Sequence, residues 1–205
     1  MVAKHDTGCQ ERGRILVLMK LQFDSRAYGK EVAGILAIDQ DGQRLIPLVS
    51  AACSSQQARS LLKQQKAQDL FPRGRAAEAA LGGLFLYFSC GQDGHQIVQN
   101  VESAEGSFWH AIVHRQEPDA GNSAYWFRQT GPHPVFEKLA GAAEEIAGQY
   151  PGAKIRRGPA WDPFWFIEFC EKARLQPGSA AENAALEIQR AEWQLLFDYC
   201  ARVQT

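Results

Sequence analysis

The segment Ala76–Cys90, AAEAALGGLFLYFSC, is apolar on almost every side when it is read as a helix. A helix of this kind lies at the centre of a core, because none of its faces is suited to water. Gly82 and Gly83 in its middle each cost about 1 kcal/mol relative to Ala. Close approach of another helix would explain that cost, and a functional kink is the alternative. We therefore expect this segment to be surrounded by other helices.

Caps and chain breaks divide the remainder of the chain after Ser54 into further helices. Asp162 caps a helix that Pro163 opens, and Ser179 with Glu182 forms a capping box for the last one. The apolar spacing predicts helices over residues 54–68, 76–90, 103–117, 123–129, 134–150, 161–175 and 179–203. The side chains expected in the core include Trp161, Phe164, Trp165, Ile167, Phe169, Trp193 and Leu196. The predicted fold class is mainly α, a single-domain multi-helix bundle of about seven helices.

Residues 1–49 show the pattern of a polar terminus followed by strands rather than helices. Residues 1–13 are polar, as in a loose terminus, and Arg14–Phe23 reads as a strand with two apolar faces. The Asp-Gly of residues 40–42 separates two apolar runs, which predicts a β hairpin over 34–49. Residues 14–49 are thus expected to form a small N-terminal β hairpin region, with irregular chain packed on helices as the alternative. Residues 1–205 are one domain, with the helical core in 55–203.

The overall composition argues against several partners. The chain of 205 residues has a formal net charge of −1, so no general attraction draws it to nucleic acid or to an anionic membrane. No apolar run reaches the ~18 residues of a membrane span, and a signal peptide is not indicated. The five cysteines are scattered and never in CxxC spacing, which predicts buried free thiols in a reducing cytoplasm. We expect a cytoplasmic protein without nucleic-acid or membrane partners; the sequence does not indicate its oligomeric state.

Most residues suited to chemistry lie between Glu105 and Glu137. On a helix, His110 and His114 are four residues apart and Glu117 is three further, so all three share one face. Two imidazoles and a carboxylate at this spacing can bind one divalent metal ion. The zinc-protease motif is absent, because Ala111 occupies the position of its catalytic Glu.

A structural interpretation of the same residues stays open. Both histidines would then form hydrogen bonds in a helical core, while Glu117 pairs with Arg115 or Arg128. His95, one turn from an apolar pair, is by itself typical of a core or surface histidine, and its alternative place is beside the two other histidines.

A second group of polar and aromatic residues follows in YWFRQTGPHP. The Gly-Pro turn returns the chain, so that Arg128 and His133 could both face the helix of His110 and His114. Aromatic walls with a few convergent polar groups are typical of ligand pockets. The candidate residues for a small polar or anionic ligand are His110, His114, Arg115, Glu117, Tyr125, Trp126, Arg128 and His133.

Two carboxylates are predicted to lie on core faces of the last helices. Glu168 sits between Trp165 and Phe169, and Glu192 follows the stripe of Ile188. A buried carboxylate needs an ion pair, hydrogen bonds or a metal, because burial of the bare charge is costly. We expect a structural ion pair, and the alternative is that both complete a bundle metal site.

The segment GSFWHAIVHRQEPDAGNSAYWFRQTGPHPVF, followed by WDPF and IQRAEWQLLFDYC, resembles segments of uncharacterised bacterial proteins. The resemblance runs from about Leu70 to Ala201 and implies no particular activity.

Two classes of function follow from the sequence. In the first, the protein is an enzyme or binding protein with a helix-lined pocket, with or without a divalent metal ion. In the second, it is a non-catalytic structural or protein-interaction domain, and its His/Arg/Glu network is a satisfied polar core. No dinucleotide fingerprint, phosphate loop or nucleophile elbow occurs, so a divalent metal is the one cofactor that the residues indicate.

Overall fold

The computed structural model describes residues 23–156, 158 and 160–203, and these residues are mainly helical. Its α-helices are α1 (Lys30–Leu36), α2 (Gln56–Lys63), α3 (Ala67–Leu70), α4 (Ala77–Tyr87), α5 (Gly91–Val98), α6 (Ala104–Gln116), α7 (Ala120–Thr130), α8 (Val135–Gln149), α9 (Pro163–Ala173) and α10 (Ala180–Ala201). Three short 3-10 helices accompany them: η1 (Ser25–Tyr28), η2 (Gln40–Gly42) and η3 (Pro151–Ala153). The mainly helical fold is confirmed, with ten α-helices in the described residues where about seven were predicted.

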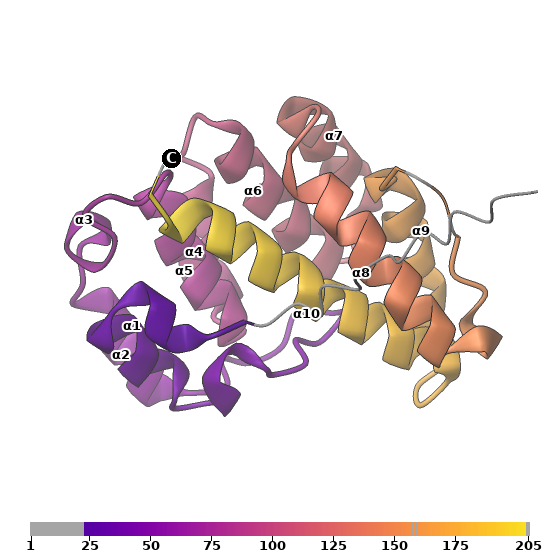
Figure 1. Cartoon of the computed structure of the whole chain (residues 1–205), viewed down its shortest axis with the longest axis horizontal. Helices are drawn as coiled ribbons and strands as arrows, with labels where there is room; N and C mark the ends of the chain where they lie inside the picture. The colour runs from indigo at the N-terminus through magenta and orange to yellow at the C-terminus, as the bar shows by residue number, and fades with distance from the viewer. Residues whose placement is uncertain (1–22, 157, 159, 204–205) are drawn as a thin grey trace, which may run out of the picture.

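Helix α10 runs along the long axis of the molecule and packs against α4, α8 and α9 (Figure 1). It begins at the predicted cap, where the Ser179 hydroxyl accepts a hydrogen bond from the backbone N–H of Glu182. Ile188, Trp193 and Leu196 on this helix are buried. The longest helix of the described chain therefore provides the surface on which the other elements assemble.

Helix α4 is buried along nearly its whole length, as its sequence predicts. Its two consecutive glycines allow close packing by two different neighbours. A Cβ on Gly83 would lie 2.6 Å from the Trp109 ring of α6, and one on Gly82 would clash with Val98 of α5. The close approach expected at these glycines is thus confirmed, and it brings α5 and α6 to the same central helix.

The predicted β hairpin is wrong for the residues that the structure describes. Residues 30–36 form α1, and the predicted turn at 40–42 is the 3-10 helix η2. Within residues 23–156 the chain from η2 onward pairs with no strand, and side chains of α10 bind its backbone instead. Gln189 Nε2 donates to the Ile46 carbonyl at 2.8 Å, and Gln194 Nε2 donates to the Gly42 carbonyl at 2.8 Å. Of the predicted strand Arg14–Phe23, all but Phe23 lies outside the described residues.

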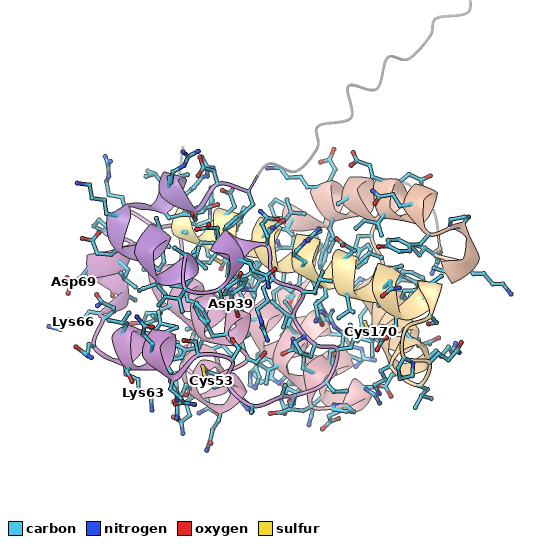
Figure 2. The ribbon with its side chains drawn as sticks, turned by 90° about the horizontal axis from the view of Figure 1, so that it is seen from below. Asp39, Cys53, Lys63, Lys66, Asp69 and Cys170 are labelled. Carbon is cyan, nitrogen blue, oxygen red and sulfur yellow. A yellow bond between two sulfur atoms is a disulfide. The ribbon has the colours of Figure 1, made fainter. Side chains whose placement is uncertain are left out.

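Two further expectations are corrected. Phe164, predicted to lie in the core, is 40% exposed because it falls on the outer side of α9. Cys53 and Cys90 form a disulfide rather than two free thiols; their Cα atoms are 4.4 Å apart although 37 residues separate them in sequence. Cys170 is a buried free thiol and lies well away from Cys53 (Figure 2). Within the described ranges, no helix combines the length and apolar character needed to cross a bilayer.

Candidate metal centre

Helices α5 and α6 bring three histidines together. His110 and His114 lie one turn apart on α6, and their rings stack with centroids 4.8 Å apart. His95 approaches from α5, with its Nε2 atom 2.8 Å from Nε2 of His110. One ring nitrogen from each of the three histidines lies within 4.8 Å of the others. The cluster is therefore compact enough for all three imidazoles to bind one ion.

The local sequence explains how α6 presents its two histidines. The Ser103 hydroxyl caps the helix by accepting the backbone N–H of Gly106 at 3.2 Å. Gly106 is required there, since a Cβ would clash with the Val101 backbone carbonyl. The cap therefore fixes where α6 begins, and with it the turn on which His110 and His114 lie.

Burial keeps the α6 histidines neutral. The pKa of His110 is lowered to about 4, mainly by burial and further by the neighbouring His95 and His114. The pKa of His114 is also lowered, again chiefly by burial, although Glu117 opposes the shift. A neutral imidazole has a free lone pair, which is the form that binds a metal ion.

Glu117 contacts the Nδ1 atoms of two of the three imidazoles and lies away from the Nε2 contact between His95 and His110. Its carboxylate oxygens are 3.1 Å from Nδ1 of His114 and 3.5 Å from Nδ1 of His95. A carboxylate that contacts the second ring nitrogen of a ligating histidine fixes the ring orientation and raises the basicity of the ligand. Glu117 thus lies beside His114, as its spacing predicts, and its second contact is with His95 of α5 rather than with His110; this arrangement suits an orienting group.

One wall of the cluster is aromatic and the other side faces solvent. The Trp126 ring of α7 stacks on His110, with centroids 4.0 Å apart and planes 25° from parallel. Tyr125, which is half exposed, contacts Trp126 edge to face. The side chain of His95 is 27% exposed and that of Glu117 is 39% exposed, whereas His110 is buried. A small ligand could therefore reach the cluster from the side of His95 and Glu117.

Arg115 belongs to a different polar group. Its guanidinium forms a fully buried ion pair with Glu192 of α10, in which Nη1 lies 3.1 Å from Oε1. The same guanidinium donates to Oε1 of Gln189 at 3.3 Å and lies over the Phe166 ring. Glu192 thus forms the structural ion pair that the sequence favoured, and it does not join the histidines.

The remaining predicted site residues are dispersed. Glu168 is exposed on α9, with Lys172 at 3.8 Å, so its assignment to a core face is wrong. Arg128 is exposed and lies over the Phe164 ring. His133 is buried among Phe108, Phe136 and Tyr199, and its Nδ1 atom accepts the backbone N–H of Val135. None of these three side chains belongs to the histidine cluster.

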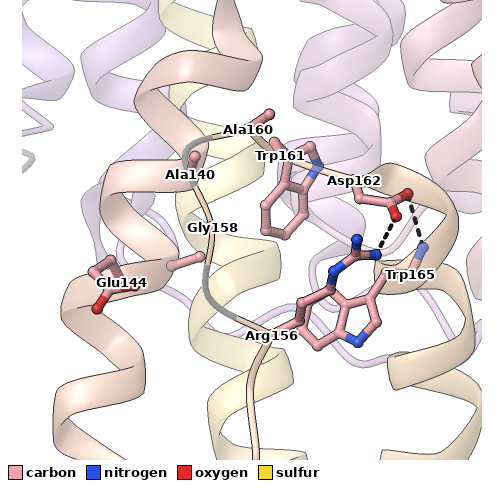
Figure 3. A pocket seen from close by; sticks show the side chains of 9 residues that line it. Ala140, Glu144, Arg156, Gly158, Ala160, Trp161, Asp162 and Trp165 are labelled. Carbon is pink, nitrogen blue, oxygen red and sulfur yellow. Dashed lines mark hydrogen bonds and ion pairs between the residues drawn. The ribbon is translucent and has the colours of Figure 1, made fainter.

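A separate cavity of about 250 Å³ lies between α8 and α9 and shares no residue with the cluster (Figure 3). Trp161 and Trp165 line it, and the ion pair of Arg156 and Asp162 spans its edge at 2.6 Å. Asp162 also caps α9, so its carboxylate already has partners. Since these charged groups are satisfied by each other, this cavity carries weaker chemical information than the histidines.

The functional residue that sequence reasoning left out of its candidate set is His95. Only the packing of α5 on α4 and α6 places it beside His110, and no spacing rule links residues fifteen apart on different helices. The sequence offers one signal for His95, which is its position about one helical turn from the apolar pair Ile97 and Val98.

Comparisons of this chain with protein families, with curated proteins and with solved structures found no match.

Proposed function

We propose that the protein is a metal-dependent binding protein or enzyme in which His95, His110 and His114 hold one divalent transition-metal ion. The observation that carries this proposal is the convergence of three imidazoles from two helices. Imidazole nitrogen is a preferred ligand of zinc and of neighbouring first-row ions. Zinc is the ion that we expect first.

The spacing of the ring nitrogens supports tetrahedral coordination. Zn–N bonds of about 2.0–2.1 Å in a tetrahedron place two ligand nitrogens about 3.4 Å apart. The separation of 2.8 Å between Nε2 of His95 and Nε2 of His110 is below this value, and the limit of 4.8 Å within the cluster is above it. Small side-chain rotations would therefore bring all three nitrogens to the required distance.

Three protein ligands leave one coordination position for water or a ligand. Catalytic zinc sites have this composition, whereas structural zinc sites have four protein ligands. The exposed side of the cluster, between His95 and Glu117, is where that position would open. The ligand that fits is small and polar or anionic, because it would meet a cation and the stacked ring of Trp126.

Within this proposal, Glu117 orients His95 and His114 through their Nδ1 atoms. Its exposed carboxylate can also accept a proton from a polar ligand that binds at the open position. A bound metal ion would supply Lewis-acid polarisation of that ligand. We also propose that the protein is cytoplasmic. Bacterial proteins that share the segment containing His110 and His114 should, on this proposal, have the same site.

The test is metal binding by tag-free protein. We expect one Zn²⁺ or Co²⁺ per chain, with the visible absorption of tetrahedral Co²⁺, and loss of binding in His95→Ala, His110→Ala and His114→Ala. His133→Asn is the matched control, since this histidine lies outside the cluster and should leave binding unchanged. Wild-type protein that takes up no ion at micromolar concentrations would refute the proposal.

A second candidate function has its own supporting observation. The 2.8 Å contact between the imidazoles of His95 and His110 is a complete N–H···N hydrogen bond if no ion binds. The cluster would then be a polar part of the core of a structural or protein-interaction domain. This candidate predicts that His110→Ala lowers the free energy of unfolding equally with and without added Zn²⁺. The metal proposal predicts instead that Zn²⁺ stabilises only the wild type.

A further inference from the structure

We propose that the Cys53–Cys90 disulfide is a redox switch that controls metal affinity at the histidine cluster. The inference rests on the proposed metal site and concerns its regulation. It arises from the position of Cys90, which directly precedes Gly91, the first residue of α5. Helix α5 carries His95, the one ligand of the three that does not come from α6.

The start of α5 has no side-chain cap among the described residues, so other contacts hold it in place. The disulfide joins it to Cys53, in the segment just before α2. One residue further, the backbone N–H of Ser54 donates to the Phe88 carbonyl at 2.7 Å. The disulfide therefore fastens the beginning of α5 to the segment before α2, and the hydrogen bond fastens the same segment to the end of α4.

Ion pairs continue the same attachment along the two helices. Asp93 of α5 lies 2.6 Å from Nε of Arg59 and 2.9 Å from Nζ of Lys63, both on α2. Asp93 is two residues from His95, so α2 restrains the turn that carries the ligand. The ion pairs are partly exposed and depend on salt, whereas the disulfide does not, which makes it the strongest of these restraints.

Reduction would remove this restraint by ordinary thiol–disulfide exchange. A thiolate of a small dithiol reductant attacks Sγ of Cys53, which is half buried, while Cys90 is buried. The S–S bond breaks, Cys90 leaves as a thiolate and takes up a proton. The second thiol of the reductant then releases Cys53 as a thiol, and the reductant becomes the disulfide. In the cytoplasm, disulfides are usually transient and redox-sensing, which fits this role.

The consequence for the metal site follows from the helix that moves. His110 and His114 stay on α6, which contacts α4 and α7. His95 depends on the position of α5, a short helix that stays packed on α4 and α6 but loses its covalent link to the segment before α2 on reduction. Loss of the correct orientation of one ligand weakens metal binding by about 10–100-fold in comparable perturbations of ligand-supporting groups. We expect the oxidised protein to bind Zn²⁺ at least about tenfold more tightly than the reduced protein.

The experiment measures Zn²⁺ affinity in both redox states by competition with a chromophoric chelator. Peptide mapping by mass spectrometry verifies the Cys53–Cys90 link in the oxidised sample. The reductant is removed under argon before the titration, because thiols bind zinc themselves. Cys53→Ser/Cys90→Ser should match the reduced wild type without any reductant, and Cys170→Ala, outside the disulfide, should keep the full redox response.

The outcomes separate this inference from the proposed function. Equal Zn²⁺ affinity in both states would overturn the switch and leave the metal site intact. Failure to form the Cys53–Cys90 link under oxidising conditions would also overturn the switch alone. Absence of Zn²⁺ binding in both states would overturn the proposed function and the switch with it. Circular dichroism of both states checks that reduction changes affinity without unfolding the protein.

Discussion

Replacing Glu192 by Gln should destabilise the fold strongly. Glu192 and Arg115 are both 0% exposed at the side chain, and the guanidinium has no route to water. Burial opposes the charge of Arg115, but attraction to Glu192 outweighs this and raises the pKa of the guanidinium, so the guanidinium is charged. Replacing the carboxylate by a neutral amide leaves a buried cation whose partners, the new amide, Gln189 and the Phe166 ring, carry no negative charge. Breaking a buried pair in this way costs about 3–5 kcal/mol.

The assay is urea unfolding at pH 7, monitored by tryptophan fluorescence and circular dichroism. Glu168→Gln is the matched control, because its exposed pair with Lys172 should contribute less than about 1 kcal/mol. The double variant Arg115→Met/Glu192→Leu should recover most of the lost stability, since it removes both charges together. A loss below about 1 kcal/mol in Glu192→Gln would refute the argument that the pair is fully desolvated.

Three further predictions test the core and its titration. Trp193→Ala should cost about 3–5 kcal/mol in urea unfolding, because the ring is 2% exposed and its Nε1 donates to a backbone carbonyl at 2.7 Å; a cost below about 1 kcal/mol would contradict its burial. Gly106→Ala should lower the melting temperature, since its Cβ would meet the Val101 backbone. Gly141→Ala is the control, because open space at its Cβ should let the substitution stabilise α8 by about 1 kcal/mol. Equal shifts in melting temperature for the two variants would disprove the packing at residue 106. His133 has a pKa lowered by burial, so its contribution is fully present above the unfolded pKa of about 6.5 and is lost as pH falls toward the folded pKa. His133→Asn should therefore flatten the decline of unfolding free energy between about pH 6.5 and pH 5, and an unchanged slope would refute it.

Local chemistry explains which helices could be predicted. Ser55, Ser103, Asp162 and Ser179 each accept a backbone N–H at the start of their helix, as their positions in the sequence indicate. A cap needs only a few consecutive residues, so sequence reasoning finds it. Helices α1, α3 and α5 escaped prediction as separate elements because they are short and their apolar residues complete too few turns to show a period.

Contacts distant in sequence explain what could not be predicted. The apolar run at 43–49 has the composition of a strand, but Gln189 of α10 donates to the backbone carbonyls of Ile46 and Pro47 within it. The disulfide likewise joins Cys53 and Cys90 because the start of α5 lies beside the segment before α2. The residues next to each cysteine in the sequence do not predict this bond. In each case the deciding partner is far away along the chain.

The candidate site likewise has one part that local sequence predicts and one part that depends on contacts distant in sequence. The spacing of His110 and His114 on one helix is a local property, and both histidines lie together as predicted. His95 completes the cluster from another helix, and only the packed structure shows it. The prediction that Arg128 and His133 belong to the site depends on the direction of the Gly-Pro turn between them. A sequence does not specify the direction of such a turn closely enough.

Helix α6 presents two polar groups that should be separable by experiment. Consecutive residues on an α-helix point about 100° apart, so His114 contacts His95 of α5 while Arg115 contacts Glu192 of α10. The Arg115 group is fully buried and its charges are paired, which is the arrangement of a stabilising or fold-specifying core. In the histidine group, burial lowers the pKa of His110 and His114, His95 is partly exposed, and the Glu117 carboxylate lies 3.1 Å from His114; the proposed metal site rests on these features. Variants of the histidines should therefore change metal binding more than stability, and variants of Arg115 should change stability more than metal binding.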